Sequence, residues 1–348
     1  MSLPTNTTEY RFSETTALQG LTLRDAPLSS PRASEVLVKI HAASLNYHEM
    51  FPKSVEGRNP KILPLVPCSD AAGEVVAIGS DVTKWKSRDR VMSNVTLDHL
   101  VGDVTAEIKA TTLGEHVDGV LTQFRSFPAH SLVKIPEHFS YEEAATLPCS
   151  AVTAWNSLYG PTPVKAGDFV LIEGTGGVSI FGLQFAVASG ATVIVTSSSN
   201  EKLEVARTLG AAYTINYNEN PDWDEEVLKI TAGRGVDHIL DVAGAGSLNK
   251  ALGAVRYAGW IHGIGFVSGG DGDLTVSGLI LRLIHRAAMY RAIWIGSVQQ
   301  FEDMNRLISA KKLRPVIDKV FAFKEVPEAY AYLASQKHVG KVVVRISQ

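Results

Sequence analysis

The chain has 348 residues, 45% of them hydrophobic, and carries a formal net charge of −3 at pH 7. This length allows two domains of ordinary size, each with its own core, whereas the charge gives no broad cationic field and so argues against a nucleic-acid partner. Only two cysteines occur, Cys68 and Cys149, which excludes a disulfide framework and a metal knuckle of closely spaced cysteines.

Neither of two candidate stretches has the pattern that directs a chain to a membrane. Residues 1–24 lack the apolar core behind a basic end that a signal peptide needs. Residues 279–295 are the most apolar late stretch, but three arginines and a histidine interrupt them. We therefore expect a cytoplasmic protein with a small-molecule substrate and no membrane partner.

The first part of the chain has the pattern of a β-rich domain. Short strands are expected at residues 35–40, 72–79 and 90–95, separated by glycine and proline. From about residue 140 strands and helices alternate instead, with strands expected at 169–172, 192–196, 212–215, 238–242, 260–265 and 292–295. Six such strands predict a doubly wound parallel sheet, and hence an α/β fold.

The most specific motif joins the first of these strands to a helix. Gly174, Gly176 and Gly177 follow the apolar run 169–172, and the helix is expected to open at Val178. Glycines let the chain turn sharply and let phosphate oxygens approach backbone N–H groups. With a helix at 180–189 and a strand at 192–196, the segment forms a βαβ unit of the length that binds a dinucleotide.

The motif departs from the usual dinucleotide fingerprint at one position. Ser179 stands where the third glycine would fall. The alternative interpretation is a glycine-rich turn that serves only a tight connection between strand and helix. The buried strand before the turn and the helix after it favour the dinucleotide site.

The end of the second strand distinguishes the two nicotinamide cofactors, because a carboxylate there accepts hydrogen bonds from a ribose 2′-hydroxyl and repels a 2′-phosphate. Ser197 and Ser198 follow the strand instead of a carboxylate, and Lys202 comes soon after. Hydroxyls, helix N–H groups and an ammonium suit a phosphate dianion, so we expect NADPH. The alternative is that Ser198 and Glu201 form only a capping box for a helix at 200–209. Glu201 is the residue that would oppose the phosphate.

The tail returns to the pattern of the first domain. Helices around 301–310 and 326–335 and a final strand at 341–346 are expected to rejoin it. This gives a substrate domain of residues 1–133 and 298–348 and a dinucleotide-binding domain of residues 134–297, with a loop at 156–166. The strand 292–295 would lie at the edge of the sheet, and an unpaired apolar edge predicts a homodimer through it.

Several segments together resemble the medium-chain dehydrogenase/reductase superfamily, namely residues 35–49, 64–79, 144–155, 173–181 and 339–343. The runs GTGGVSIFGLQFA and SSSNEKL, and the Gly-Ser stretch before Phe301, resemble its NADP-dependent alcohol-dehydrogenase-like and quinone-oxidoreductase-like members. The resemblance spans nearly the whole chain. It implies a GroES-like catalytic domain in addition to the Rossmann sheet.

Members of this superfamily that use catalytic zinc carry a cysteine and a histidine where this chain has Asn46 and Ser69. An amide and a hydroxyl are poor zinc ligands. Cys149 resembles a family position for small packing residues. We therefore expect no metal site.

The resemblance also implies roles for residues. Asn46 is expected to orient cofactor and substrate, and Tyr47 to donate a hydrogen bond or a proton to the substrate oxygen. The alternative for Tyr47 is an aromatic wall of the pocket, and His48 with Glu49 is expected to form an ion pair. Lys341 would reach the phosphates. The alternative for each of Thr153, Tyr217 and Lys341 is an ordinary structural role. The expected cofactor-binding residues are Asn46, Thr153, Thr175, Gly176, Gly177, Val178, Ser197, Ser198, Lys202, Tyr217, Gly265, Val267, Ile295 and Lys341.

Without a metal, hydrogen bonds must stabilise charge on the substrate oxygen, which suits enones and quinones because hydride addition to them gives a delocalised enolate. We therefore expect a zinc-independent, NADPH-dependent oxidoreductase that acts on an activated alkene, a quinone or a carbonyl compound. The alternatives are carbonyl reduction of the alcohol/aldehyde dehydrogenase type and a non-catalytic NADPH-binding protein. Loops at 51–63, 94–102 and 269–291 are expected to set the substrate.

Overall fold

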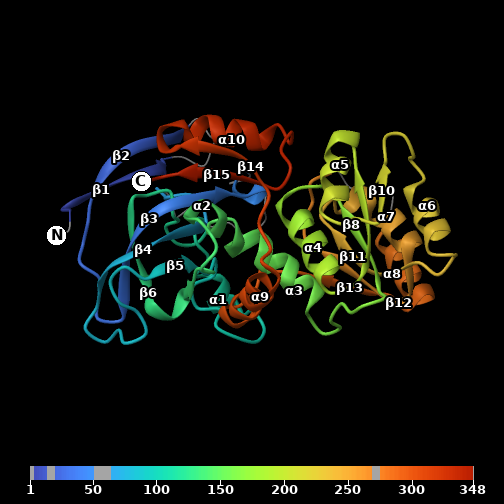
Figure 1. The fold of residues 1–348 in the computed structure, drawn as a ribbon, viewed down its shortest axis with the longest axis horizontal. Helices are drawn as coiled ribbons and strands as arrows, with labels where there is room; N and C mark the ends of the chain where they lie inside the picture. The colour runs from blue at the N-terminus through green and yellow to red at the C-terminus, as the bar shows by residue number, and fades with distance from the viewer. Residues whose placement is uncertain (1–3, 14–19, 51–63, 269–274, 348) are drawn as a thin grey trace. The chain divides into compact units, whose positions relative to one another are not determined.

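The computed structural model of the protein describes residues 4–13, 20–50, 64–268 and 275–347. These residues form two compact units (Figure 1). Unit 1 comprises the chain up to Val152 and from Ile295 onward, and unit 2 comprises Thr153–Trp294. Of the expected substrate loops, residues 51–63 and 269–274 lie outside the described residues.

The first boundary between the units lies after Val152, whereas the sequence pattern places it after residue 133. The segment in between includes two helical turns, α2 (Tyr141–Ala144) and the π-helical η5 (Leu147–Ala151). α2 packs against β3 (Glu35–Leu45) and β4 (Asp70–Ile78), and η5 packs against β4. These strands belong to unit 1, so the segment joins that unit.

Within the described residues, unit 1 contains a two-stranded and a seven-stranded sheet. The small sheet pairs β1 (Asn6–Phe12) with β2 (Leu21–Pro27). The large sheet has the order β14-β15-β3-β4-β5-β7, and β6 also pairs with β3. Its further strands are β5 (Arg90–Ser93), β6 (Phe124–Pro128), β7 (Leu132–Lys134), β14 (Ile317–Ala322) and β15 (Lys341–Arg345). The short helices of the unit include α1 (Ala106–Lys109), η2 (Tyr47–Met50), η4 (Ala129–Ser131) and η6 (Phe323–Glu325).

The C-terminal tail completes the large sheet, as the sequence predicts. α9 (Val298–Lys311) and α10 (Val326–Ala334) precede β15, which pairs antiparallel with β3 through Val342 opposite Leu45. The first four residues of β15 are buried, and its side chains join those of β3, β4 and α10 in one apolar core. The pairing therefore places the start of β15 beside the end of β3.

Unit 2 is built on a six-stranded parallel sheet with the order β10-β9-β8-β11-β12-β13. Counted along the chain, this is the 3-2-1-4-5-6 order of a doubly wound dinucleotide fold, so the predicted fold class is confirmed. Its strands are β8 (Phe169–Glu173), β9 (Thr192–Ser197), β10 (Tyr213–Asn216), β11 (Val236–Asp241), β12 (Val255–Gly263) and β13 (Met289–Ala292). Its helices are α3 (Val152–Leu158), which begins at the boundary, α4 (Gly177–Ala188), α5 (Asn200–Thr208), α6 (Trp223–Ile230), α7 (Ala245–Ala254) and α8 (Val276–Arg286).

The central strands of unit 2 are apolar because helices cover both faces of the sheet. Residues 170–172 of β8 and 193–195 of β9 are fully buried. Continuous apolar runs of this kind are typical of parallel strands, and this is why the sequence pattern identified them. The strands meet side chains from α6 and α7 in one core that includes Leu171, Val227, Ile239 and Leu252.

Three local predictions for unit 2 differ from the structure. β13 ends at Ala292, and Ile295 takes a left-handed backbone (φ +39°) that is incompatible with a strand at 292–295. α3 extends into the expected loop at 156–166, and Ser157 Oγ donates to the Thr153 carbonyl within this helix. α5 is capped by Ser199 rather than Ser198, because the Ser199 side chain accepts from the Lys202 N–H.

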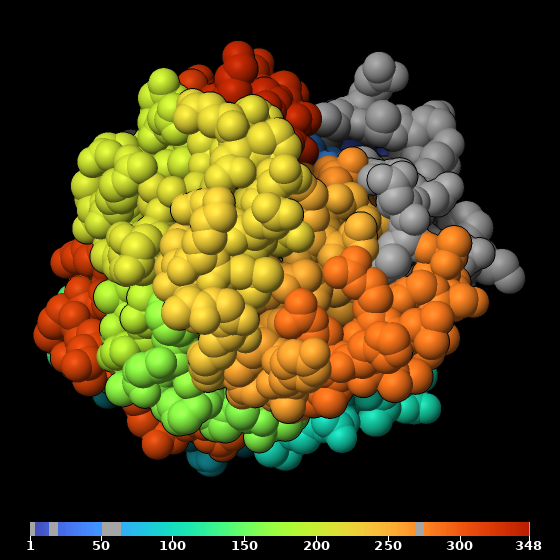
Figure 2. Space-filling model, turned by 90° about the vertical axis from the view of Figure 1, so that its right-hand side faces the viewer, coloured from blue at the N-terminus to red at the C-terminus, as the bar shows by residue number. Residues whose placement is uncertain are grey.

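α8 presents apolar side chains to solvent. Val276, Ile280, Leu281 and Ile284 are between 51% and 75% exposed, and the orange segment that contains α8 lies on the face of unit 2 seen in Figure 2. α8 has 11 residues. Among the residues with a described placement, no helix combines the length and the apolar character that crossing a bilayer requires.

Candidate functional site

Unit 2 carries the predicted dinucleotide turn between β8 and α4. Gly174 has φ +70°, a left-handed conformation that glycine adopts without steric cost. Gly176 is the N-cap of α4, and a Cβ at this position would meet no atom within 4 Å. α4 has no side-chain cap, so its first N–H groups and positive dipole end suit a phosphate. Thr175 is buried in the turn, and Gly177 and Val178 are half-buried.

The role of the third glycine in the fingerprint is taken by another residue. Ser179 Oγ donates to the Glu173 carbonyl at 2.7 Å and ties the start of α4 to the end of β8. Gly182 lies further along α4, and a Cβ there would be only 2.5 Å from Leu240 Cδ2 of β11. Gly182 therefore permits the close approach of helix and sheet that the third glycine normally provides.

Two buried carboxyl groups that no sequence motif predicts lie beside this turn. Glu173 ends β8 and Asp241 ends β11, and Ser247 Oγ lies 3.0 Å from Glu173 Oε2 and 3.3 Å from Asp241 Oδ1. Burial, and then the nearby Asp241, raise the pKa of Glu173 well above its ordinary value, and burial also raises the pKa of Asp241. Two adjacent buried carboxylates would repel each other, so this pair holds a proton more tightly than an isolated carboxyl group does.

The loops after β11 and β12 meet at the same edge of the sheet. A Cβ on Gly244 would lie 2.7 Å from the Gly265 carbonyl oxygen, and a Cβ on Gly265 would lie 2.5 Å from the Val242 carbonyl oxygen. The Val267 N–H donates to the Val242 carbonyl at 3.3 Å. Gly265 and Val267 thus lie at the carboxyl ends of the strands, near the β8/β11 switch point where this topology binds dinucleotides.

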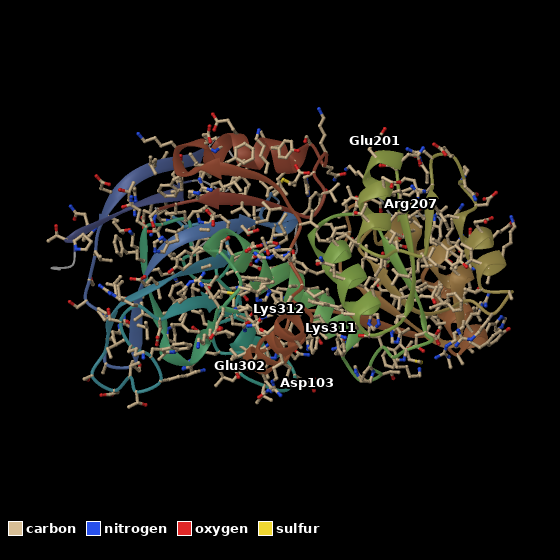
Figure 3. All side chains as sticks on the ribbon, in the orientation of Figure 1. Asp103, Glu201, Arg207, Glu302, Lys311 and Lys312 are labelled. Atoms are coloured by element: carbon tan, nitrogen blue, oxygen red, sulfur yellow. The ribbon has the colours of Figure 1, made fainter. Side chains whose placement is uncertain are left out.

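The carboxyl end of β9 carries the residues expected to select the cofactor. Ser197 is buried, and its carbonyl accepts the Tyr217 N–H at 3.0 Å, which places the 41% exposed Tyr217 beside the strand end. Ser198 follows, and then the Ser199 hydroxyl hydrogen bonds with the Glu201 carboxylate. Figure 3 shows Glu201 at the N-terminal end of α5, with Arg207 further along the same helix.

Charges of both signs surround this end of β9. Lys202 lies in the first turn of α5 and is half-buried. Glu219 Oε1 accepts from Asn200 Nδ2 at 2.6 Å and from Asn216 Nδ2 at 3.1 Å. Two carboxylates, Glu201 and Glu219, therefore lie near the expected 2′-phosphate position, although neither belongs to β9 itself.

Thr153 and Ile295 lie where the chain passes between the two units. Thr153 is the first residue of unit 2 and is buried in α3. Ile295 is the first residue of the returning part of unit 1, and its φ of +39° is strained for a β-branched residue. Strain of this kind clusters at functional positions, so Ile295 stays a candidate cofactor-binding residue.

In unit 1, Asn46 lies at the centre of a buried polar cluster, which we call the Asn46 cluster. Its members are Asn46, Glu49, Asp70, Ser150, Tyr330 and Lys341. Asn46 Oδ1 accepts from Lys341 Nζ at 2.6 Å and from Ser150 Oγ at 3.2 Å. Asn46 Nδ2 donates to Glu49 Oε1 at 3.3 Å and to the Ser44 carbonyl at 3.4 Å. All four hydrogen-bonding positions of the amide therefore have partners within unit 1.

Lys341 supplies the cation of this cluster. It is 3% exposed, and its Nζ also donates to the Leu45 carbonyl at 2.8 Å and to Ser150 Oγ at 3.2 Å. Asp70 Oδ2 lies 3.5 Å from the same nitrogen. The resemblance implies that Lys341 reaches the cofactor phosphates, whereas the structure shows its ammonium bonded within unit 1.

Glu49 and Asp70 give the cluster two carboxyl groups for one ammonium. Burial, and then the nearby Asp70, raise the pKa of Glu49 to about 7. Burial also raises the pKa of Asp70, an effect that Lys341 opposes. The Glu49 carboxyl is bound by Asn46 and by the Tyr330 hydroxyl, at 3.1 Å, whereas an ion pair with His48 was expected. Glu49 therefore takes up a proton near neutral pH.

Tyr47 lies beside the cluster in η2 and is half-buried, as is His48. Gln336 Nε2 donates to the Tyr47 hydroxyl oxygen at 3.3 Å. This contact holds the ring against the segment between α10 and β15. A phenol both accepts and donates hydrogen bonds, so the expected donor role stays a prediction.

The donors of the cluster do not fit a zinc ion. Asn46 and Ser69 offer an amide and a hydroxyl, and the Ser69 hydroxyl donates to Asp70 Oδ1 at 3.2 Å. The Lys341 ammonium, 2.6 Å from Asn46 Oδ1, would repel a metal ion at this position. Among the described residues, no group of three or more histidine, cysteine, aspartate or glutamate side chains is arranged to hold a metal.

Three members of the cluster, Asp70, Ser150 and Tyr330, are not predicted from the sequence, because the members are far apart in the chain. Asn46 and Lys341 are 295 positions apart, and Asn46 and Ser150 are 104 apart. The available signals were the charged residues Asp70 and Lys341, each of which adjoins an apolar run. Ionisable groups in such positions are rarely buried unless they are paired.

Comparison with known proteins adds the family. The chain matches the family model of the alcohol dehydrogenase GroES-like domain at residues 32–137 and that of the zinc-binding dehydrogenase domain at residues 177–310. The second match does not include the positions of Asn46 or Ser69. The description 'zinc-binding' therefore does not apply to the residues of the Asn46 cluster, which lies outside that match.

Individual proteins match over nearly their whole length. A zinc-type alcohol dehydrogenase-like protein of Schizosaccharomyces pombe is 45% identical over 90% of this chain and 91% of its own. A 2-haloacrylate reductase of a Burkholderia species is 31% identical over 92% and 93% of the two chains. The crystal structure of a provisionally assigned alcohol dehydrogenase from Sinorhizobium meliloti 1021 is 36% identical, with a TM-score of 0.90 over 99% of this chain and 100% of that one. Together with the strand order of unit 2, these matches show that the chain belongs to the medium-chain dehydrogenase/reductase superfamily of oxidoreductases.

Proposed function

We propose that this protein is a metal-independent, NADPH-dependent oxidoreductase that transfers a hydride to an activated alkene, a quinone or a carbonyl compound. The observation that carries the proposal is the Lys341 ammonium, which is bonded to Asn46 and paired with Asp70. Asn46 is one of the two positions where the resemblance places a zinc ligand, and an amide bonded to a fixed ammonium does not fit that role. Hydrogen-bond donors would then stabilise charge on the acceptor oxygen.

The dinucleotide turn of unit 2 supports the cofactor part of the proposal. The N-terminus of α4 and the open space at Gly176 would hold a pyrophosphate. Gly265 and Val267, at the ends of the neighbouring strands, would border the nicotinamide half. A bound nicotinamide dinucleotide supplies the hydride.

The preference for NADPH rests on the end of β9. Ser197 and Ser198 stand there in place of a carboxylate, and Lys202 offers an ammonium in the next turn. Glu201 and Glu219 oppose a 2′-phosphate, and the Asn200 and Asn216 amides hold Glu219 in place. In NAD-specific folds the carboxylate that binds the ribose follows the strand directly. Neither Glu201 nor Glu219 does so here, and for this reason we propose a preference for NADPH.

In unit 1, Tyr47 is the residue that we propose to contact the acceptor. Its hydroxyl would donate a hydrogen bond to the acceptor oxygen and then a proton to the enolate. Asn46, whose amide is fully bonded inside unit 1, would hold η2 and hence Tyr47 in position. Donors of this strength suit an enolate, whose charge is delocalised, better than an alkoxide.

The experiment combines cofactor titration with turnover after metal removal. Purified protein treated with a chelator should bind NADPH at least about tenfold more tightly than NADH, which corresponds to about 1.4 kcal/mol. It should then oxidise NADPH in the presence of an enone or a quinone at an unchanged rate. Loss of turnover on chelation with recovery on adding zinc, or equal affinity for the two cofactors, contradicts the proposal.

A second candidate is reduction of an isolated carbonyl, which the zinc-type alcohol dehydrogenase-like relative favours. The products distinguish the two reactions. An unsaturated aldehyde should give the saturated aldehyde if the alkene is reduced. Formation of the unsaturated alcohol would instead support the second candidate.

We also propose a cytoplasmic homodimer that forms through the edge of the unit 2 sheet. β13 is an edge strand, as expected, although it spans Met289–Ala292 rather than 292–295. The neighbouring α8 leaves Ile280 and Ile284 more than half exposed, and apolar surface of this kind is typical of an interface. Light scattering at micromolar concentration should give twice the mass of the chain, and a monomer mass would exclude the dimer.

A further inference from the structure

We infer that Lys341 is a positioning residue whose ammonium fixes the orientation of the Asn46 amide. This inference rests on the proposed function, because it assigns to Lys341 a part in the same hydride transfer. It differs from the role that the resemblance implies, which is contact with the cofactor phosphates.

The first step is the geometry of the ammonium. A lysine ammonium has three N–H donors, and three oxygens of unit 1 receive them. These are the Leu45 carbonyl at 2.8 Å, Asn46 Oδ1 at 2.6 Å and Ser150 Oγ at 3.2 Å. A phosphate could be bound only if at least one of these buried bonds were broken, so the geometry favours an internal role.

The second step is the orientation of the amide. Two donors, Lys341 Nζ and Ser150 Oγ, meet Asn46 Oδ1, while Glu49 Oε1 and the Ser44 carbonyl meet Asn46 Nδ2. A half-turn of the amide about its last bond would set NH2 against an ammonium and oxygen against oxygen. The cation therefore determines which end of Asn46 faces which neighbour.

The third step is the support of the cation. Asp70 Oδ2, 3.5 Å away, balances its charge, and the Ser69 hydroxyl donates to the other oxygen of this carboxylate. The strand pairing of β15 with β3 places Lys341 beside Asn46. Gly340 before it has φ +72°, and a Cβ there would lie 2.3 Å from the Val316 carbonyl oxygen, so the backbone leading to Lys341 is closely constrained.

The test compares three variants for cofactor affinity and turnover. Lys341→Met removes the charge and keeps the chain length, Lys341→Arg keeps the charge in a planar group, and Lys324→Met is the control at an exposed lysine of the same unit. For each, the Kd of NADPH is measured by fluorescence titration, and kcat and KM are measured with an enone.

A positioning role predicts a loss in kcat without a loss in cofactor affinity. Lys341→Met should lower kcat about 100-fold and leave the Kd of NADPH within about threefold, because the phosphates bind to unit 2. Lys341→Arg should also lose at least about tenfold in kcat, since a planar guanidinium cannot direct three N–H groups to the same oxygens. Lys324→Met should match the wild type.

The opposite pattern would overturn the inference. If Lys341→Met weakens NADPH binding more than about tenfold, retains kcat at saturation and is restored by Lys341→Arg, then Lys341 is a phosphate ligand. If the wild type turns over no acceptor at all, the proposed function fails first, and the variants then have no kcat to compare. The two failures are therefore distinguishable.

Two double variants keep the test decisive if Lys341→Met does not fold. Lys341→Met with Asp70→Asn removes both partners of the buried ion pair, and it should fold, bind NADPH and still show the kcat loss; a wild-type kcat would contradict the inference. On an Asn46→Ala background, Lys341→Met should cost less than about threefold further, because residues that act as a unit are not additive. Full additivity would show that Lys341 does not act through Asn46.

Discussion

The fold moves the charge change of Glu49 to near neutral pH. Its carboxyl is buried between Asn46 and Tyr330, and burial, with the nearby Asp70, raises its pKa from 4.5 to about 7. A raised carboxyl pKa means that the folded chain binds the proton more tightly than the unfolded chain. The resulting stabilisation is complete below pH 4.5 and is lost as the pH rises through about 7.

Glu49→Gln should remove this pH dependence. A pKa difference of this size corresponds to about 3 kcal/mol, so the free energy of unfolding of the variant should rise relative to the wild type by up to this amount between about pH 5 and about pH 8. Urea unfolding at a series of pH values measures it. Parallel curves for the two proteins would show that Glu49 is not protonated in the folded chain.

At the scale of elements, the carboxyl edge of the unit 2 sheet depends on glycines that let loops approach closely. Gly244 precedes α7, has φ +82°, and would place a Cβ 2.7 Å from the Gly265 carbonyl oxygen. Its N–H donates to Asp241 Oδ1 at 2.7 Å. The residue thus links the carboxyl pair at the strand ends to the loop that carries Gly265 and Val267.

Gly244→Ala should destabilise unit 2 by about 3 kcal/mol, because it adds a backbone clash to the strain of an alanine at φ +82° and ψ −137°, a region that only glycine adopts readily. Gly233→Ala is the control for a positive φ without a clash, since Gly233 has φ +81° and a Cβ added there would meet no atom within 4 Å. The control should cost about 1 kcal/mol. Urea unfolding compares the two, and equal losses would show that the contact with Gly265 has no energetic weight.

At the scale of elements, strand β15 in the C-terminal tail contributes to the stability of unit 1. β15 lies between β14 and β3, so the last of the described strands is an interior strand of the sheet. Three of its side chains, Val342, Val343 and Val344, are fully buried. Burying each valine contributes about 1.5 kcal/mol or more, which makes β15 a major contributor to this unit.

At the scale of the whole molecule, the two units should respond differently to loss of the tail. A chain that ends after Ser335 lacks β15 and Lys341, and its unit 1 sheet has a gap between β14 and β3. Unit 2 keeps its complete sheet and its dinucleotide turn. We expect calorimetry to show loss of the unit 1 transition, while fluorescence titration still detects NADPH binding. Loss of both at once would show that unit 2 does not fold without unit 1.

Features that depend on neighbouring residues could be predicted from the sequence. Apolar runs, a glycine turn and helix periodicity identified the Rossmann sheet and the dinucleotide turn, because a βαβ unit is formed by about 30 consecutive residues. It also identified the tail that rejoins the first domain. Even at this local level, the expected N-cap of α5 was Ser198, one residue before the observed Ser199. Several consecutive serines offer similar hydroxyls, so the sequence does not distinguish them.

Contacts between side chains that are distant in the chain could not be predicted, because they depend on how the strands pair. The pairing of β15 with β3 brings Lys341 to Asn46 across 295 positions, and that of β8 with β11 brings Glu173 and Asp241 to one Ser247 hydroxyl. Hydrogen bonds and charges inside a protein depend on distance in space, and strand pairing sets that distance independently of position in the chain. The sequence therefore indicated a dinucleotide oxidoreductase, and the fold revealed the internal cation on which its chemistry is proposed to depend.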